Sequence, residues 1–255
     1  MIGPLDPAGV QILSPEWPAP PSVCAAFTLR QGGVSAAPFD TLNVGVHVGD
    51  EAAAVAENRR RVRARLSLPE EPTWIEQVHG VDVVDLDAAA QAAGMPTADG
   101  AITRRAGRVC AVQVADCLPV LLSTRDGSAV AAAHAGWRGL AAGVLEATVK
   151  SLAADPADLL AWLGPGIGPA HFEVGAEVRE AFIAHDAAAA EAFTANPRGR
   201  WQCDLASLAR RRLAVLGIGA VFGGQWCTYS DAARFFSYRR DGRCGRMAAL
   251  IWREH

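Results

Sequence analysis

The chain has 255 residues, 51% of them hydrophobic, so it can bury one large core or two modest ones. Its 24 basic and 27 acidic side chains give a formal net charge of −3, which excludes the strongly basic surface that a nucleic acid or an anionic membrane requires. We therefore expect a small-molecule partner, no nucleic acid and no membrane.

The first 22 residues are rich in proline and lack both the basic start and the long apolar stretch of a signal peptide or membrane span. We expect a Pro-rich leader over 1–22, one catalytic domain over 23–255 and a cytoplasmic location. The six cysteines form no C-x-x-C pair, so in a reducing compartment they should be thiols or metal ligands. The oligomeric state is left open.

Strand-like and helix-like segments alternate in the first half of the chain. Residues 23–29 predict a strand, and 51–68 predict a helix with a strongly basic face. Three apolar runs follow at 73–86, 109–124 and 128–134 and are predicted to be strands of one sheet.

The second half completes an α+β pattern. Helices are predicted over 140–154, 175–193 and 204–217, and a last strand over 246–252. The helix that begins after the glycines of "AGWRG" has backbone N–H groups at its start that can meet an anion.

The Asp126-Gly127 dipeptide predicts a hairpin turn between two of the apolar runs. Positions equally distant from this turn pair, so His134 should lie opposite Pro119. Cys117 and His134 then point from the same face of the hairpin and can meet. Pro119 would have to lie on an edge strand or at a bulge, because it has no N–H to donate.

Two histidines at strand ends, His79 and His134, join Cys117 as candidate ligands for Zn²⁺ with a fourth position open for water. Such a site lowers the pKa of bound water and makes a nucleophile at neutral pH. The same residues also suit a metal-free hydrolase in which a histidine activates the Cys117 thiolate. Asp116 and Gln77 lie close by in sequence and could support the ligands or contact a substrate.

Two further segments attract attention. The glycine-rich stretch 163–175 lacks a G-K-[ST] sequence and the G-x-G-x-x-G pattern, so we interpret it as turns. The stretch 227–246 is rich in arginine and aromatic residues. We expect a packed C-terminal hairpin with a basic rim there; the alternative is a surface that stacks on a planar ring and holds an anion.

The motifs "EQVHG", "ADCLPVLL", "AHAGWRG" and "FEVG", followed by "CTYSDAARFFSYRRDGRCGRMAALIW", closely resemble the YfiH family. Its members are also called polyphenol oxidase or laccase-domain proteins, purine nucleoside phosphorylases and peptidoglycan editing factors. The resemblance implies a single α+β domain with a central mixed sheet flanked by helices, similar to the catalytic domain of cytotoxic necrotizing factor toxins. It also implies zinc held by His79, Cys117 and His134. Ser230 and Cys244 depart from the family pattern.

The implied activity is zinc-dependent phosphorolysis of adenosine, inosine and methylthioadenosine, together with adenosine deamination. We expect His79, Cys117 and His134 to be catalytic, and nucleoside and phosphate to be the small-molecule partners. The residues expected to contact the substrate are Asn43, Arg59, Gln77 and Arg239. The alternative is an amidohydrolase that edits peptidoglycan precursors, with Cys117 or a zinc-activated water as nucleophile.

Copper-dependent phenol oxidation is a secondary interpretation. Multicopper oxidases need many histidines, typically in H-x-H pairs, whereas this chain has six histidines and no such pair. Cu²⁺ is still a possible occupant of the His/Cys site, because such donors bind it more tightly than zinc.

Overall fold

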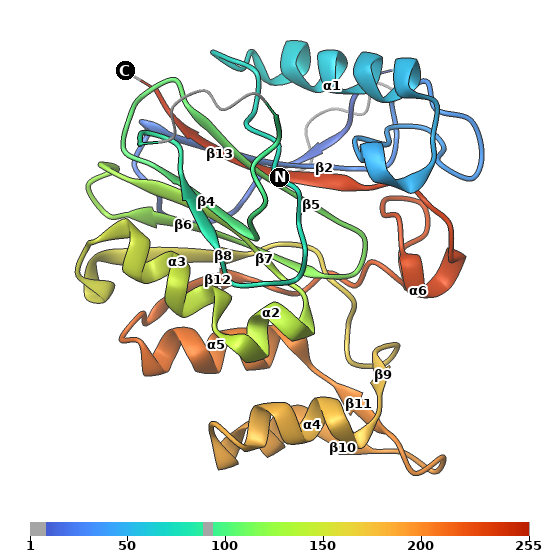
Figure 1. The fold of residues 1–255 in the computed structure, drawn as a ribbon, viewed down its shortest axis with the longest axis vertical. Helices are drawn as coiled ribbons and strands as arrows, with labels where there is room; N and C mark the ends of the chain where they lie inside the picture. The colour runs from blue at the N-terminus through green and yellow to red at the C-terminus, as the bar shows by residue number, and fades with distance from the viewer. Residues whose placement is uncertain (1–8, 89–93, 255) are drawn as a thin grey trace.

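Two β-sheets pack face to face at the centre of the computed structural model, which describes residues 9–88 and 94–254 (Figure 1). Helices cover the outer face of each sheet. The fold is therefore α+β, as expected, and its core lies in three layers: between the sheets and beneath each set of helices.

The four-stranded sheet is antiparallel and has the order β1-β2-β13-β5. Its strands are β1 (Ile12–Leu13), β2 (Val23–Thr28), β13 (Met247–Arg253) and β5 (Val109–Val114). Helix α1 (Ala52–Leu66) covers the outer face and ends where Ser67 takes a left-handed φ of 50°. Part of the predicted leader thus lies in a sheet, since β1 pairs with β2; residues 1–8 of it lie outside the described residues.

The six-stranded sheet has the order β12-β8-β6-β7-β4-β3 and mixes parallel and antiparallel pairs, which confirms the expected central mixed sheet. Its strands are β12 (Ala220–Gly223), β8 (Leu159–Leu163), β6 (Leu118–Thr124), β7 (Val130–Ala135), β4 (Gly100–Thr103) and β3 (Val83–Asp85).

Helices α2 (Trp137–Ala142), α3 (Val144–Leu152) and α5 (Leu205–Val215) pack on the outer face of the six-stranded sheet. Beyond them lie α4 and a small three-stranded sheet of order β10-β11-β9 (Figure 1). The remaining elements are α4 (Ala176–Ile183), β9 (Glu173–Val174), β10 (Phe193–Ala195), β11 (Trp201–Cys203), α6 (Tyr238–Asp241), and 3₁₀ helices η1 (Val46–Val48), η2 (Pro156–Asp158) and η3 (Ala187–Ala192).

Strand alternation decides which side chains enter the gap between the sheets. On β7, Ala131, Ala133 and Ala135 pack toward the helices, whereas Val130 and Ala132 face the other sheet. His134 has the parity of the second pair and therefore emerges on the inter-sheet face, at the end of its strand.

The hairpin prediction is confirmed, since Pro119 pairs with His134 across β6 and β7. Pro119 itself was placed wrongly: it lies in β6, an interior strand, and not at an edge or bulge. It is the second residue of that strand, and the neighbouring segment uses only its carbonyl, which accepts the Gly164 N–H at 2.9 Å. A missing N–H is tolerated where the ladder begins.

Several sequence boundaries were wrong because backbone turns interrupt apolar runs. The run 109–124 splits into β5 and β6, which belong to different sheets, because Asp116 takes a left-handed φ of 92°. The helix 140–154 divides into α2 and α3 at Gly143, whose φ is 107°. The helix 175–193 ends at Ile183, and Asp186 caps the separate η3. Segment 227–246 forms loops and α6, not a hairpin.

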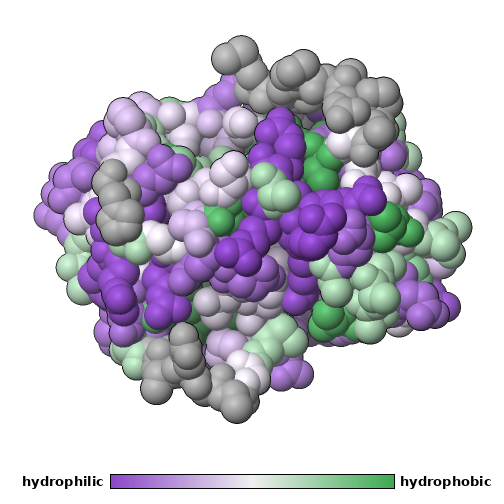
Figure 2. Space-filling model, turned by 90° about the horizontal axis from the view of Figure 1, so that it is seen from above, coloured by the Kyte–Doolittle hydropathy of each residue, from purple (hydrophilic) through white to green (hydrophobic). Residues whose placement is uncertain are grey.

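The face on which α1 lies is largely hydrophilic in the view from above (Figure 2). Among the described residues, no helix combines the length and apolar character needed to cross a membrane.

The packing between the sheets predicts a large effect for Leu121→Ala. Leu121 is 0% exposed and faces the four-stranded sheet, so truncation should lower the free energy of unfolding by about 2–5 kcal/mol. Val215→Ala is the control: Val215 is 77% exposed, and its truncation should change the free energy by about 0.5 kcal/mol or less. Urea unfolding measures both, and equal losses would contradict this description of the core.

Candidate active site

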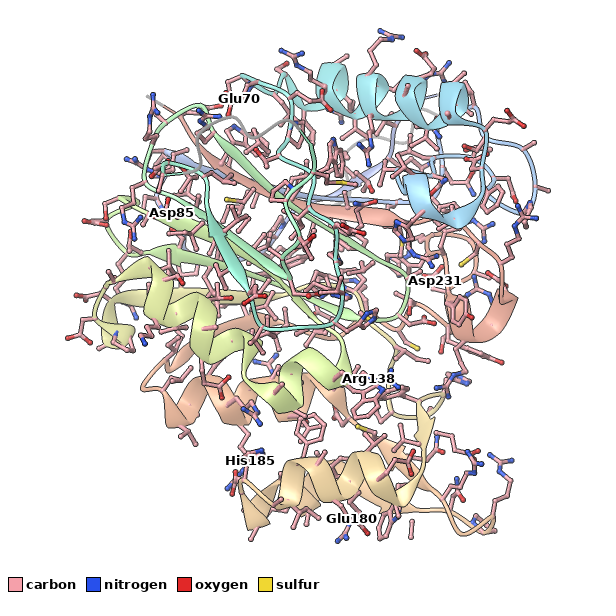
Figure 3. The ribbon with its side chains drawn as sticks, viewed as in Figure 1. Glu70, Asp85, Arg138, Glu180, His185 and Asp231 are labelled. Carbon is pink, nitrogen blue, oxygen red and sulfur yellow. The ribbon has the colours of Figure 1, made fainter. Side chains whose placement is uncertain are left out.

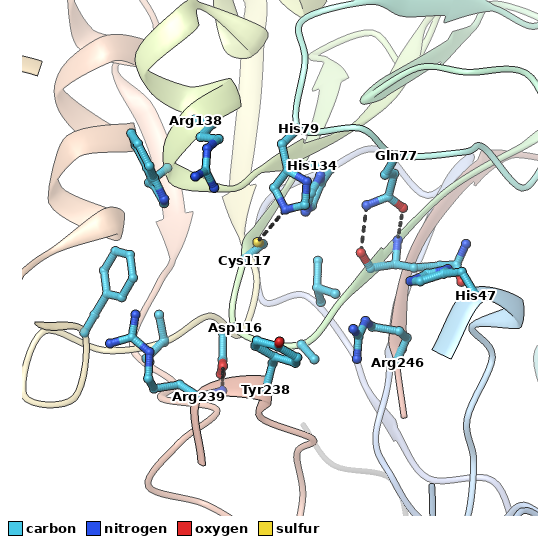
Figure 4. Close-up of a pocket in the computed structure, with 16 residues that line it drawn as sticks. His47, Gln77, His79, Asp116, Cys117, His134, Arg138, Tyr238, Arg239 and Arg246 are labelled. Atoms are coloured by element: carbon cyan, nitrogen blue, oxygen red, sulfur yellow. Dashed lines mark hydrogen bonds between the residues drawn. The ribbon is translucent and has the colours of Figure 1, made fainter. Parts of the chain in front are cut away.

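Three predicted ligands meet where β5, β6 and β7 reach the same end of the inter-sheet gap (Figure 4). The ligand atoms of His79, Cys117 and His134 all lie within 4.8 Å of one another. The Cys117 Sγ is 3.8 Å from the His79 Nε2, and the two imidazole rings meet edge to face with centroids 4.8 Å apart. We call these three residues the trio.

Local backbone geometry brings the trio together. His79 takes a left-handed φ of 61°, and Cys117 follows the left-handed Asp116. Gly136 leaves the space that the ligands occupy: a Cβ there would lie 2.9 Å from the Cys117 Sγ and 3.0 Å from the His79 ring. Gly136, the first glycine in "AHAGWRG", is therefore required because these side chains approach its backbone closely.

Asp99, which the sequence analysis missed, fixes two members of the trio. One of its carboxylate oxygens lies 2.8 Å from the His134 Nδ1 and accepts the His79 N–H at 2.9 Å. The other accepts the N–H groups of Gly80 at 2.6 Å and Val78 at 3.2 Å. Because this fully buried carboxylate binds Nδ1, the His134 Nε2 is left to face the other two members of the trio. This arrangement is typical of metal-bound histidine. Its only sequence signal is an acidic residue directly before a strand.

The trio is a strongly coupled electrostatic site. Burial raises the pKa of the Cys117 thiol, but His134 and His79 outweigh burial and lower it to about 6. Burial lowers the pKa of His134, but the Cys117 thiolate and Asp99 outweigh that effect and raise it to about 9. Burial also raises the pKa of Asp99, yet hydrogen bonds from His134 and Gly80 bring it below its ordinary value. The ligand thiol is therefore ionised at neutral pH.

The Cys117–His79 pair has a separation that suits a tetrahedral metal ion. Bond lengths of about 2.3 Å to sulfur and about 2.05 Å to nitrogen place these atoms about 3.6 Å apart in a tetrahedron. The Cys117 Sγ and His79 Nε2 are 3.8 Å apart, close to that value. Three protein ligands leave one coordination position facing the adjoining cavity. Within the described part of the chain, this is the one group of histidine, cysteine and acidic side chains close enough to hold a metal ion.

The trio opens into a cavity of about 530 Å³. Figure 4 shows Arg138 and Arg239 on one side of the trio, and His47, Gln77 and Arg246 on the other. Figure 3 shows that Arg138 lies on the side of the fold nearer Asp231 and away from Asp85. The other lining residues are Gln113, Val114, Ala115, Asp116, Trp137, Ile167, Phe172 and Tyr238, together with the trio itself.

Two of the four predicted substrate residues line this cavity. The Gln77 amide binds both main-chain groups of Gln113, at 2.7 and 2.8 Å. The Arg239 main-chain N–H donates to Asp116 at 2.7 Å, and its guanidinium binds the Glu173 carbonyl at 2.9 Å.

The structure does not bring Asn43 and Arg59 to the cavity wall. Asn43 is fully buried; its amide donates to Asp50 and accepts the Arg246 N–H, so it supports the segment that carries Arg246. Arg59 binds the Val44 carbonyl at 3.0 Å and stacks on Trp74 at 4.0 Å.

Several cavity residues were absent from the predicted site. Segment 227–246 contributes Tyr238, Arg239 and Arg246, so it matches the alternative interpretation, a surface of aromatic and arginine side chains. Arg138 lies in the quoted motif "AHAGWRG", but nothing in the motif distinguished it from a solvated arginine. The unpredicted lining residues with polar groups include His47, Gln113, Arg138, Tyr238 and Arg246, and Asp99 behind the trio was not predicted either.

These features define an α+β protein with an open three-ligand donor set between two sheets. Residues 24–254 match the family described as multi-copper polyphenol oxidoreductase laccase. The chain belongs to this family, which confirms the resemblance to YfiH proteins.

The relatives are similar over nearly their whole lengths. A Pseudomonas aeruginosa protein named purine nucleoside phosphorylase is 55% identical, covering 94% of this chain and 97% of its own. Purine nucleoside phosphorylase YfiH of Escherichia coli is 52% identical, covering 95% and 98%. The solved structure of a Neisseria meningitidis DUF152 protein is 45% identical with a TM-score of 0.92, covering 96% and 99%. The structure of Bacillus licheniformis hypothetical protein YfiH is 30% identical with a TM-score of 0.88, covering 98% of each chain.

The donor set predicts stoichiometric binding of Co²⁺, a spectroscopic substitute for Zn²⁺. The protein should bind one Co²⁺ with a thiolate charge-transfer band that Cys117→Ser removes. Asp99→Asn should keep the band and weaken binding about 10–100-fold, because it disturbs only the orientation of the ligands. Cys203→Ser is the matched control, since Cys203 is buried elsewhere. A band that survives in Cys117→Ser would contradict the assignment.

The lowered pKa of Cys117 predicts rapid alkylation of the metal-free protein. Only the thiolate reacts, so the iodoacetamide rate at Cys117 should rise with pH, reach half its maximum near pH 6 and then level off. Cys24 should react only at much higher pH, because burial raises its pKa to about 11. Peptide mapping by mass spectrometry follows both sites; a Cys117 midpoint near pH 9 would show that the histidines do not stabilise the thiolate.

Proposed function

We propose that the protein is a zinc-dependent purine nucleoside phosphorylase that acts on adenosine, inosine and methylthioadenosine, with His79, Cys117 and His134 as its metal ligands and catalytic centre. The observation that carries this proposal is the open donor set beside a cavity with arginines and no free carboxylate. The names of the Pseudomonas and Escherichia relatives support it. The six free cysteines favour a reducing compartment, so we place the reaction in the cytoplasm.

The arginine side of the cavity suits phosphate. Among the described residues, no hydrogen bond or ion pair engages the Arg138 guanidinium, which lies over the Trp137 ring at 4.6 Å. Arg239 stacks on Phe172 and uses one terminal nitrogen for a carbonyl. These two arginines can therefore offer charged N–H groups to an oxyanion.

No described carboxylate in the cavity wall competes for the arginines. Asp116 is the one acidic lining residue, and both of its oxygens already accept hydrogen bonds. The Thr228 hydroxyl donates to one at 2.6 Å, and the Arg239 main-chain N–H donates to the other at 2.7 Å. The cavity thus keeps an excess of positive charge for a bound anion.

In the proposed reaction an oxygen of hydrogen phosphate forms a bond to the ribose C1′ as the C1′–N9 bond breaks. The electron pair of that bond leaves with the purine, and the phosphate proton ends on the purine, so the products are the free base and ribose 1-phosphate. The trio would hold the zinc ion, which would supply Lewis-acid polarisation when bound. Arg138 and Arg239 position the phosphate, while Asp99 holds His79 and His134 in place.

As a second activity of the proposal, the same site would also deaminate adenosine: the oxygen of water bonds to C6, the C6–N6 bond breaks, and inosine and ammonia are the products. The peptidoglycan alternative uses the same donors for amide hydrolysis and predicts release of an amino acid from a muramyl precursor. Multi-copper oxidation is disfavoured: the described residues bring together one metal-binding group, whereas that chemistry needs several coppers.

The central test is adenosine incubated with zinc-loaded protein, with and without phosphate. Adenine and ribose 1-phosphate should form only with phosphate, and inosine should form in both reactions if the protein also deaminates. If neither adenine nor inosine forms at high enzyme concentration, and an amino acid is released from a muramyl precursor, the phosphorylase proposal is wrong and the hydrolase replaces it.

The two arginines predict a phosphate-specific defect. Arg239→Gln and Arg138→Gln should each raise the KM for phosphate about 10-fold or more, since each loses a charge-assisted contact worth about 1.5–3 kcal/mol. Arg60→Gln, a change on the exposed side of α1, should leave it unaltered. Steady-state kinetics at saturating nucleoside measures the effect. If the KM for phosphate is unchanged in both cavity variants, phosphate does not bind at these two arginines.

A further inference from the structure

The cavity wall contains three aromatic side chains, and only one of them is exposed. The Arg138 guanidinium lies over the Trp137 ring at 4.6 Å. The Arg239 guanidinium lies over the Phe172 ring at 5.3 Å. Tyr238 is the third, and it is 61% exposed. Among the phenylalanine, tryptophan and tyrosine side chains that the structure describes, it is the one exposed side chain, so its ring is accessible from the cavity.

The backbone beneath Tyr238 is held firmly. Tyr238 is the first residue of α6, which Ser237 caps by accepting the Arg240 N–H at 3.3 Å. The Arg240 guanidinium also donates to three main-chain carbonyls at 2.8–2.9 Å. Asp116, which precedes Cys117 of the trio, accepts the main-chain N–H of the second α6 residue at 2.7 Å. These contacts fix the base of the tyrosine side chain relative to the trio, so a ligand that meets its ring pays little to order the backbone.

The Tyr238 side chain itself is free to meet a ligand. No hydrogen bond within the described residues engages its hydroxyl, and its one cation–π or aromatic pairing there is with the Arg246 guanidinium, 5.9 Å from the ring centroid. That distance is near the limit of about 6 Å for such a pairing, so the arginine covers the ring only loosely. Figure 4 shows Tyr238 below Cys117, between Arg239 and Arg246. The ring therefore offers a face to a planar group that enters the cavity.

We propose that the Tyr238 ring stacks on the purine base and so selects a planar leaving group; this inference rests on the proposed phosphorolysis. Every purine has a flat π-face, and stacking on an aromatic ring does not depend on the group at position 6. One tyrosine thus accepts adenine and hypoxanthine alike. Arg239 follows Tyr238 in α6, and successive helical residues point about 100° apart. One short helix therefore serves the base and the phosphate at separate places.

The test measures equilibrium binding to the zinc-loaded protein by calorimetry without phosphate, so it does not depend on phosphorolysis. The probes are adenosine, inosine and ribose 1-phosphate, which lacks a base. Tyr238→Leu should weaken adenosine and inosine about 10-fold each and leave ribose 1-phosphate unchanged, because only the stacked base loses its partner. Tyr238→Phe keeps the ring and should bind all three probes as the wild type does. Tyr229→Leu is the matched control, since Tyr229 stacks on His171 and lies outside the cavity wall.

Because Tyr238 is exposed, both of its variants should fold, and an unchanged Co²⁺ thiolate band checks that the trio is intact. Unchanged nucleoside binding in Tyr238→Leu, or equal weakening of ribose 1-phosphate, would overturn the stacking role. A loss in Tyr238→Phe as large as in Tyr238→Leu would also overturn it, because the hydroxyl would then be the binding group. The expected binding pattern without any phosphorolysis would leave Tyr238 as the base-binding residue and reject the phosphorylase proposal instead.

Discussion

The buried carboxylate of Asp99 is the constraint on which the site depends. It contacts the His134 imidazole and accepts the main-chain N–H groups of Val78, His79 and Gly80. One side chain therefore sets both the ring orientation of one ligand and the backbone of another. A carboxylate in a fully buried position is stable only because these donors satisfy it. The positions of the ligands follow from this network more than from the strands that carry them.

Much of the site could be predicted from the sequence because its local geometry has simple rules. The Asp-Gly turn fixed the register of β6 and β7, and the register placed Cys117 near His134. Asp99, Arg138 and Gln113 were missed, since their roles come from contacts between segments distant in the chain. Asn43 and Arg59 were reasonable choices by residue type, but three-dimensional packing directs them to the support of other segments.

The fold was predicted in class and in most of its elements, and the errors share a cause. An apolar run in the sequence does not reveal where the backbone turns inside it. Residues 109–124 look like one strand, yet a left-handed residue at Asp116 sends the two halves into different sheets. Gly143 divides a continuous helical pattern in the same way. The turn at Asp116 lies in the cavity wall, where it contributes irregular backbone to the site.

The split between β5 and β6 would give a metal ion at the trio a structural role. Cys117 stands at the crossing from one sheet to the other, His134 belongs to the six-stranded sheet, and the His79 loop is tied to β5 through Gln77. An ion bound by all three residues would cross-link the two sheets. Any ligand that binds only the folded state adds to its stability. The free energy of unfolding of this chain would then depend on the free metal concentration around it, and a chelator would remove the cross-link between its two sheets.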